Sequence, residues 1–468
     1  MTSTDASTPG SAAPELSARV MRGFAGTVLA RPWFDDAGLF ALRHWFFPLS
    51  RLWAAAGVAR GDAAAFHAAV PMIPRLEHRD RVVRALAHFE EARAAANAME
   101  AEWERVFFGT ADVPETYRFA VEAARHKLRH AFYASRRHFR FMVRPDVPRV
   151  KLAIDTPREA EAIYGAALDD PAPLFAASQY PPAIEMSRRL PSDTGTDFWL
   201  RFASPSARLG DTAWARVHEP PDVTDPPTVI YGHGICVEFD HWRGLIDECH
   251  ALVRLGFRVI RPEAPFHGRR LVSGNFGGEH IIGAFPTGIL DALTGAVQEW
   301  SVLAGWARET SRGPLVFAGS SLGALTSQLA ADRARAWPEP MRPDALLLIT
   351  HTGDLTEAVT GGALANLWTS PVEMEKKGWT LELARKYLAI LNPGATLALP
   401  PQRVVSVLGR RDVILPFEGG RELTERWCLP TENSFVWDRG HFSVPMTLMR
   451  NSAPLQRLAR IVEDLKRR

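Results

Sequence analysis

The chain has 468 residues, of which 46% are hydrophobic and 23% are charged. This length predicts two or three domains, or one domain with large additions, and a core that can support a deep site. The formal charge of only +2 gives no reason to expect a nucleic-acid partner. The three cysteines have neither C-x-x-C nor metal-ligand spacing, so we expect a reducing compartment and no disulfide framework.

The N-terminal segment differs in composition from the rest of the chain. Residues 1–20 are small and polar and lack the basic and apolar regions of a secretory signal, so we interpret them as a disordered leader. The sequence holds no run of about 18 uninterrupted apolar residues, which predicts that no helix spans a membrane. Peripheral contact with a membrane stays open, and a cytoplasmic location is expected.

Residues 21–190 form a predicted helical region. Apolar residues recur at steps of three and four between Leu39 and Trp53, as on one face of a helix. A second helix is predicted from about Arg79 to Phe108, which contains no Gly or Pro, and a third over about 114–144. The later prolines indicate irregular chain: Pro145, Pro148, Pro157, Pro171 and Pro173.

Two features of this region each have two interpretations. The aromatic residues between Trp33 and Trp53 are expected to pack against the following domain, or else to rest on a membrane interface. The basic, aromatic-containing stretch over 125–140 resembles a phosphate-binding surface. The more common reading is a charged helix face that pairs with the glutamates of the preceding helix.

Residues 191–468 alternate between apolar strands and helices. Two strands are predicted near 198–202 and 212–217, and six short apolar runs follow, separated by helical segments: 228–231, 258–260, 315–318, 345–350, 403–408 and 434–437. This pattern predicts an α/β fold with a mostly parallel sheet, helices on both faces and an antiparallel edge. Residues 354–400 interrupt the alternation and are interpreted as a helical cap insertion.

A G-x-S-x-G motif lies between a strand and a helix. It reads Gly319-Ser320-Ser321-Leu322-Gly323 and directly follows the apolar run 315–318. In this context the motif predicts a nucleophile elbow with Ser321 at its tip, beside the free N–H groups of a helix start. The alternative is a Gly-Ser turn with no chemistry. Ser320 occupies the variable position of the motif.

An activated serine needs a base, and the base needs an acid that orients it. Asp412 follows the run 403–408, and His441 follows the run 434–437 on a glycine-containing loop. The three residues follow one another along the chain as Ser321, Asp412 and His441, which is the Ser, Asp, His order expected with a nucleophile elbow. We therefore predict Asp412 and His441 as acid and base. Asp354 is the fallback acid, because it too follows a strand.

The oxyanion of an acyl-transfer reaction needs two N–H donors. We predict the amides of Leu322, after the serine, and of Ile235, in the loop after run 228–231, with Cys236 as the next choice. His233 in the same loop is interpreted as a structural brace rather than a base. Cys236 is a poor nucleophile candidate, because no base precedes it in the expected order.

Together these residues resemble the α/β-hydrolase superfamily over about 197–468. The resemblance implies a serine hydrolase, of the carboxylesterase or lipase type, that cleaves a carboxylic ester through an acyl-enzyme. It implies no metal and no cofactor. Two alternatives remain open: an acyltransferase with the same triad, and a non-enzymatic scaffold on the same fold.

The segment Glu263-Ala264-Pro265-Phe266-His267-Gly268-Arg269-Arg270 carries a second resemblance, to the group around α/β-hydrolase domain-containing protein 18. It implies a lipid-like ester as substrate. His267 would then lie near the site entrance, although a histidine that stabilises a turn is the favoured interpretation. The expected partner is a small-molecule or lipid-like ester.

Overall fold

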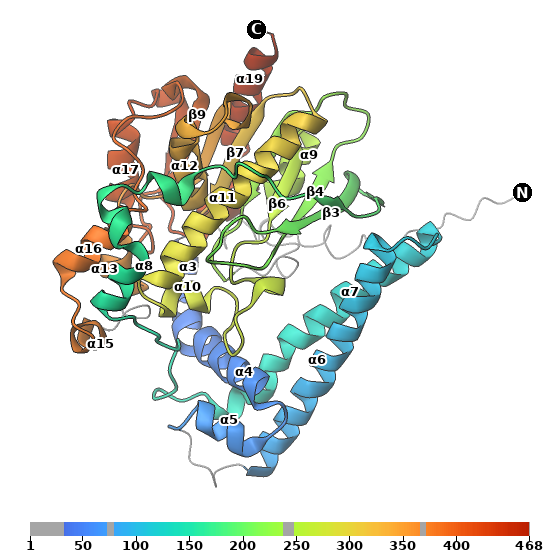
Figure 1. Cartoon of the computed structure of the whole chain (residues 1–468), viewed down its shortest axis with the longest axis vertical. Helices are drawn as coiled ribbons and strands as arrows, with labels where there is room; N and C mark the ends of the chain where they lie inside the picture. The colour runs from blue at the N-terminus through green and yellow to red at the C-terminus, as the bar shows by residue number, and fades with distance from the viewer. Residues whose placement is uncertain (1–31, 73–78, 237–247, 366–370, 468) are drawn as a thin grey trace, which may run out of the picture.

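The computed structural model describes residues 32–72, 79–236, 248–365 and 371–467. A ten-stranded sheet lies at its centre, and a long helical hairpin extends away from the sheet (Figure 1). The predicted leader, residues 1–20, lies outside the described residues. Among those residues, no helix is both long and apolar enough to cross a bilayer.

The strand order in the sheet is β1-β3-β4-β6-β5-β7-β8-β9-β10, with β2 paired to β3. Neighbouring strands are parallel from β6 to β10, whereas β1, β2, β3 and β4 form antiparallel pairs and β4 is antiparallel to β6. The predicted mostly parallel sheet with an antiparallel edge is thereby confirmed. The strands are β1 (Glu185–Met186), β2 (Leu190–Ser192), β3 (Gly195–Ala203), β4 (Thr212–Glu219), β5 (Thr228–Gly232), β6 (Arg258–Pro262), β7 (Leu315–Ser320), β8 (Ala345–Ile349), β9 (Val404–Gly409) and β10 (Ser434–Trp437).

Helices cover both faces of the sheet because both faces of its inner strands are apolar. On β7, Phe317 belongs to the core on the side of α11 (Thr287–Thr310) and α12 (Leu322–Arg333). Its neighbours Val316 and Ala318 belong to the opposite core, with α9 (Glu248–Arg254) and α19 (Ala453–Lys466). This alternation is the period of two that a β-strand imposes.

The N-terminal helices share their core with the sheet. Buried residues such as Trp53 and Phe89 belong to the same cluster as Ile230 and Phe317 of the inner strands. The aromatic residues between Trp33 and Trp53, here called the aromatic stripe, are buried only in part, since Trp53 is 3% exposed and Trp45 is 61% exposed. The elements are α3 (Pro32–Ala41), a π-helical turn (Leu42–Phe46), α4 (Phe47–Ala59), α5 (Ala63–Ala69), α6 (Arg79–Phe108), α7 (Glu115–Ala134) and a 3₁₀ helix (Ser135–Met142).

The hairpin of α6 and α7 is joined to the antiparallel edge of the sheet by stacked arginine and tryptophan side chains. The Arg125 guanidinium on α7 lies 5.7 Å from the ring centre of Trp199 on β3, and the Arg269 guanidinium, which follows β6, lies 5.1 Å from the ring centre of Trp103 on α6. Arg129 also pairs with Glu100 across the hairpin at 2.8 Å. Arg125 and Arg129 of the basic stretch therefore serve helix packing, as the more common of the two interpretations expects.

Pro157 begins a helix, which corrects the expectation of irregular chain there. In α8 (Pro157–Asp169), Thr156 and Glu159 form a capping box, and proline is tolerated at a first helical position. The third predicted helix was also too long, because α7 ends at Ala134. Further helices are α10 (Glu279–Gly283), α13 (Leu355–Gly361), α15 (Pro371–Lys376), α16 (Leu381–Ala389), α17 (Phe417–Arg426) and α18 (Ser443–Leu448). The division at residue 190 and the cap role of 354–400 stay predictions.

Candidate active site

Ser321 sits at a sharp turn between β7 and α12. Its φ of +56° and ψ of −119° lie in a region that non-glycine residues rarely adopt. The Ser321 N–H donates to the Ile349 carbonyl at the end of β8, 2.9 Å away. A β-carbon on Gly319 would lie 2.3 Å from the Gly323 carbonyl carbon, so the motif needs this glycine. The geometry is that of the predicted elbow.

Three predicted side chains meet at this turn. Nε2 of His441 lies 2.9 Å from Oγ of Ser321, and Nδ1 of His441 lies 2.7 Å from Oδ2 of Asp412. They come from the ends of β7, β9 and β10, which are parallel neighbours or near neighbours in the sheet. The imidazole can therefore accept a proton from the hydroxyl while the carboxylate fixes its tautomer.

The second oxygen of Asp412 orients the carboxylate. Oδ1 accepts hydrogen bonds from the N–H groups of Ile414 and Leu415, at 2.9 and 3.0 Å. Both Asp412 and His441 are buried. The fallback acid has a different role: the side chain of Asp354 accepts from Thr356 N–H and caps the start of α13.

The two predicted oxyanion donors lie on converging elements. Leu322 is the first residue of α12, so its N–H has no acceptor within the helix. Ile235 lies in the loop after β5, and its N–H makes no hydrogen bond to the residues that the structure describes. The Cys236 N–H, the second choice, is bonded to Nε2 of His267 at 3.1 Å.

Two histidines hold this loop by reciprocal hydrogen bonds. His267 accepts from Cys236 N–H, and His233 accepts from Ala264 N–H, also at 3.1 Å, so each ring binds the backbone of the other's loop. In each ring Nδ1 bonds a nearby carbonyl, of Pro265 or Gly234 respectively. Sequence reasoning missed this reciprocity, because each contact spans two separate loops.

Burial keeps both rings neutral. It lowers the pKa of His267 to about 4 and holds the pKa of His233 well below its usual value. A neutral ring with its proton on Nδ1 leaves Nε2 as the acceptor that the neighbouring N–H requires. His267 is fully buried, which corresponds to the favoured interpretation of a turn-stabilising histidine.

The segment 263–270 is held by buried ion pairs. Arg270 bonds Glu299 at 2.6 Å and Asp211 at 2.8 Å, and both Arg270 and Glu299 are almost completely buried. The Glu263 carboxylate pairs with the Arg269 guanidinium at 3.2 Å. These charges are satisfied within the protein and fix the loop that carries His267.

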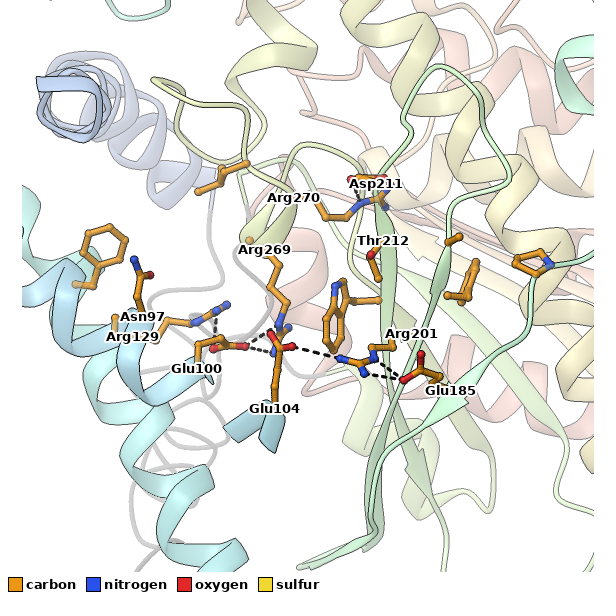
Figure 2. A pocket seen from close by; sticks show the side chains of 18 of the residues that line it. Asn97, Glu100, Glu104, Arg129, Glu185, Arg201, Asp211, Thr212, Arg269 and Arg270 are labelled. Carbon is orange, nitrogen blue, oxygen red and sulfur yellow. Dashed lines mark hydrogen bonds and ion pairs between the residues drawn. The ribbon is translucent and has the colours of Figure 1, made fainter. Parts of the chain in front are cut away.

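A cavity of about 1030 Å³ lies away from the triad (Figure 2). It opens between α6 and α7 on one side and β3 and β4 on the other. Its charged lining residues are paired with one another: Glu100 with Arg129, and Arg201 with Glu104 and Glu185. Neither Ser321 nor its two partners line it, so the cavity is separate from the candidate active site.

The sheet order, the elbow and the placement of the helices define an α/β-hydrolase fold. No family model and no curated protein matches the chain. Solved structures do match over much of their length, at low identity. Acetyl xylan esterase 1 from a Thermoanaerobacterium species is 16% identical, covers 67% of this chain and 96% of its own, and has a TM-score of 0.45.

Two further solved structures are similar to the chain. An S-formylglutathione hydrolase from Agrobacterium tumefaciens is 15% identical over 59% of this chain and 98% of its own, with a TM-score of 0.39. A hyperthermophilic esterase from Pyrobaculum calidifontis is 14% identical over 66% and 93%, with a TM-score of 0.37. None of the comparisons supports the resemblance to the group around α/β-hydrolase domain-containing protein 18.

Proposed function

We propose that this protein is a serine hydrolase that cleaves a carboxylic ester through an acyl-enzyme on Ser321. The observation that supports it most is the continuous hydrogen-bonded chain from Ser321 Oγ through His441 to the Asp412 carboxylate. The buried acid and the strained serine turn add support, because strained backbone and oriented buried acids cluster at catalytic sites.

The reaction would proceed in two halves. His441 Nε2 takes the hydroxyl proton while Ser321 Oγ attacks the ester carbonyl, and the oxyanion receives hydrogen bonds from Leu322 N–H and Ile235 N–H. The imidazolium then gives its proton to the leaving alkoxide, and an alcohol departs. Water attacks the acyl-enzyme with His441 again as base, which releases the acid and restores Ser321.

An ester rather than an amide is proposed because alcohols are better leaving groups than amines, and the expected substrate is a small-molecule or lipid-like ester. An alcohol that replaced water in the second half would make the same site an acyltransferase. Product analysis with and without added alcohols separates these outcomes, since transfer yields a new ester and hydrolysis yields the free acid.

The direct test compares Ser321→Ala with Ser320→Ala as matched control. Turnover of nitrophenyl esters of increasing chain length is measured together with labelling by a fluorophosphonate probe. We expect Ser321→Ala to lose about 10⁴- to 10⁶-fold in turnover and to take up no probe, and Ser320→Ala to retain labelling. Stoichiometric labelling of the Ser321→Ala protein would remove the basis for the proposal.

A further inference from the structure

Asp35 lies on α3, far from the candidate active site in sequence, yet its carboxylate binds the loop that carries His441. Oδ1 accepts the N–H groups of Phe442 and Ser443, at 2.7 and 3.1 Å. Oδ2 accepts the Ser443 hydroxyl at 2.5 Å. The side chain is 6% exposed, so these three bonds replace the water that the carboxylate would otherwise hold.

The contact extends to the residue before His441. Oγ of Ser443 accepts the Gly440 N–H at 3.0 Å, which links Asp35 through one hydroxyl to the other side of the histidine. A β-carbon on Gly440 would lie 2.4 Å from Cγ of Asp35, so the carboxylate fills the space that this glycine leaves. Backbone groups on both sides of His441 are thus fixed by one buried acid.

The helix that carries Asp35 also packs on the same loop. A β-carbon on Gly38, one turn later in α3, would lie 3.1 Å from the Phe442 ring. The N–H groups of Phe442 and Ser443 lie at the N-terminus of α18 and have no acceptor inside that short helix. A carboxylate is therefore a favourable partner for them. The carboxylate that accepts these hydrogen bonds lies on α3, which precedes every strand of the sheet in the sequence.

We propose that Asp35 is a positioning residue for His441, so that the N-terminal helix α3 is part of the catalytic apparatus. This inference rests on the proposed function. His441 must hold Nε2 against Ser321 and Nδ1 against Asp412 at the same time, which leaves little tolerance in its backbone. A misplacement of about 1 Å costs on the order of 10²-fold in rate.

Loss of this support slows proton transfer and leaves substrate binding unchanged. In the full chain, Asp35→Ala is compared with Asp35→Asn and with Asp36→Ala, an exposed neighbour on the same helix. We expect Asp35→Ala to bind a full equivalent of fluorophosphonate but to react about 10- to 100-fold more slowly. Its kcat on a short nitrophenyl ester falls equally, with KM within about twofold.

The conservative variant keeps the geometry. The amide oxygen of Asp35→Asn still accepts N–H groups, so its labelling rate is expected to return to within about fivefold of the wild type. Asp36→Ala reacts at the wild-type rate. Ser443→Ala removes only the hydroxyl that joins Asp35 to Gly440, and we expect a loss of roughly 5- to 10-fold, between the losses expected for Asp35→Asn and Asp35→Ala.

Several outcomes would overturn the inference. A lower titre of reactive sites with an unchanged rate per site would mean that Asp35 serves folding alone. If Asp35→Ala does not fold, Ser443→Ala decides, and a wild-type labelling rate there rejects the positioning role. Failure of the proposed function is separate, because it is seen as retained labelling in Ser321→Ala. If Ser321→Ala loses labelling while Asp35→Ala is labelled at the wild-type rate, only the positioning role of Asp35 is rejected.

Discussion

The backbone of Gly323 in α12 is in direct contact with that of Gly232 at the end of β5. A β-carbon on Gly323 would lie 1.9 Å from the Gly232 carbonyl oxygen, and one on Gly232 would lie 2.6 Å from the Gly323 α-carbon. No side-chain motion relieves such an overlap, because both partners are main chain. Leu322 directly precedes Gly323, and the loop that carries Ile235 begins directly after Gly232, so the contact joins the segments of the two predicted oxyanion donors.

Gly323→Ala is therefore expected to push α12 away from β5. Overpacking of this kind costs about 1–3 kcal/mol of unfolding free energy or more, and kcat is expected to fall if the two predicted oxyanion donors are moved apart. Thermal unfolding and ester turnover measure the two effects. Gly361→Ala is the control, because open space surrounds that glycine. Equal melting temperatures for both variants would contradict the prediction.

The assignment of the acid is tested by two asparagine substitutions. Asp412→Asn is expected to lower turnover by up to about 10⁴-fold, because an amide favours the wrong histidine tautomer. Asp354→Asn is expected to retain activity, because the asparagine side chain can still accept the Thr356 N–H and cap α13. Rates measured side by side decide, and the reverse ranking would move the acid role to Asp354.

The strands were predictable because each apolar run is short and bounded by helical or turn sequence. The elbow was predictable for the same reason, since Ser321 directly follows one such run. The support from Asp35 was not predictable. No local pattern marks a carboxylate whose partners lie at Phe442 and Ser443, at the opposite end of the chain.

Other features were missed for local reasons. The Thr156 and Glu159 pair matches the sequence pattern of a capping box, whereas the proline between them is more often found in irregular chain. The end of α7 at Ala134 carries no Gly or Pro signal, because the chain continues as a 3₁₀ helix. The partly exposed stripe shows that periodicity predicts an apolar face but not how much of it is covered.

The histidine pair predicts sensitivity to acid. Since burial lowers the pKa of His267 to about 4, the folded ring stays neutral while the unfolded ring takes up a proton near pH 6.5. The free energy of unfolding is unaffected above that pH and decreases as the pH falls from about 6.5 toward 4, by up to about 1.4 kcal/mol per pH unit for this proton.

His267→Gln tests this prediction, because a glutamine amide oxygen can replace Nε2 as the acceptor for Cys236 N–H. We expect the variant to lose stability less steeply between pH 6.5 and 4, while His233 still contributes a decrease of the same sign. Denaturant unfolding at a series of pH values measures the slopes. Parallel curves for wild type and variant would show that His267 is not the group that titrates.

A buried ion pair connects α4 to α10. Arg51 bonds both carboxylate oxygens of Glu279, at 2.8 and 2.9 Å, and Glu279 also accepts the N–H groups of Lys151 and Phe276. Arg51→Met leaves this carboxylate buried without its cation, which is expected to cost about 3–5 kcal/mol. Glu279→Gln added to Arg51→Met should recover part of the loss.

The pH dependence gives an independent check on that pair. Burial already raises the pKa of Glu279 although Arg51 opposes it, so loss of Arg51 raises the pKa further. Between the pKa of Glu279 in the unfolded chain and its raised pKa in the folded variant, the folded variant binds a proton that the unfolded chain does not hold. The stability of the variant therefore falls as the pH rises between these two values. Arg51→Met is expected to be less destabilised at pH 5 than at pH 8. An equal loss at both values would mean that Glu279 stays charged.

The predicted boundary at residue 190 can be tested by dividing the chain there. Buried side chains of α4 and α6 belong to the same core as the inner strands. Two buried contacts also join the two parts: the Arg51–Glu279 ion pair and the hydrogen bond from Ser443 to Asp35. A chain that begins at Leu190 would expose this apolar surface and leave Glu279 without its cation. We expect it to aggregate.

Expression of residues 1–189 and 190–468 as two polypeptides tests whether the N-terminal helices are an integral part of the fold or an independent unit on a tether. If the helices are an integral part of the fold, the two polypeptides should associate without a covalent link, because the shared core drives association. The pair should then regain ester turnover, and Asp35→Ala in the 1–189 polypeptide should lower it again. A soluble 190–468 chain with full turnover on short and long esters would contradict this. The helices would then be an independent unit, and their contacts with the sheet would contribute nothing to catalysis.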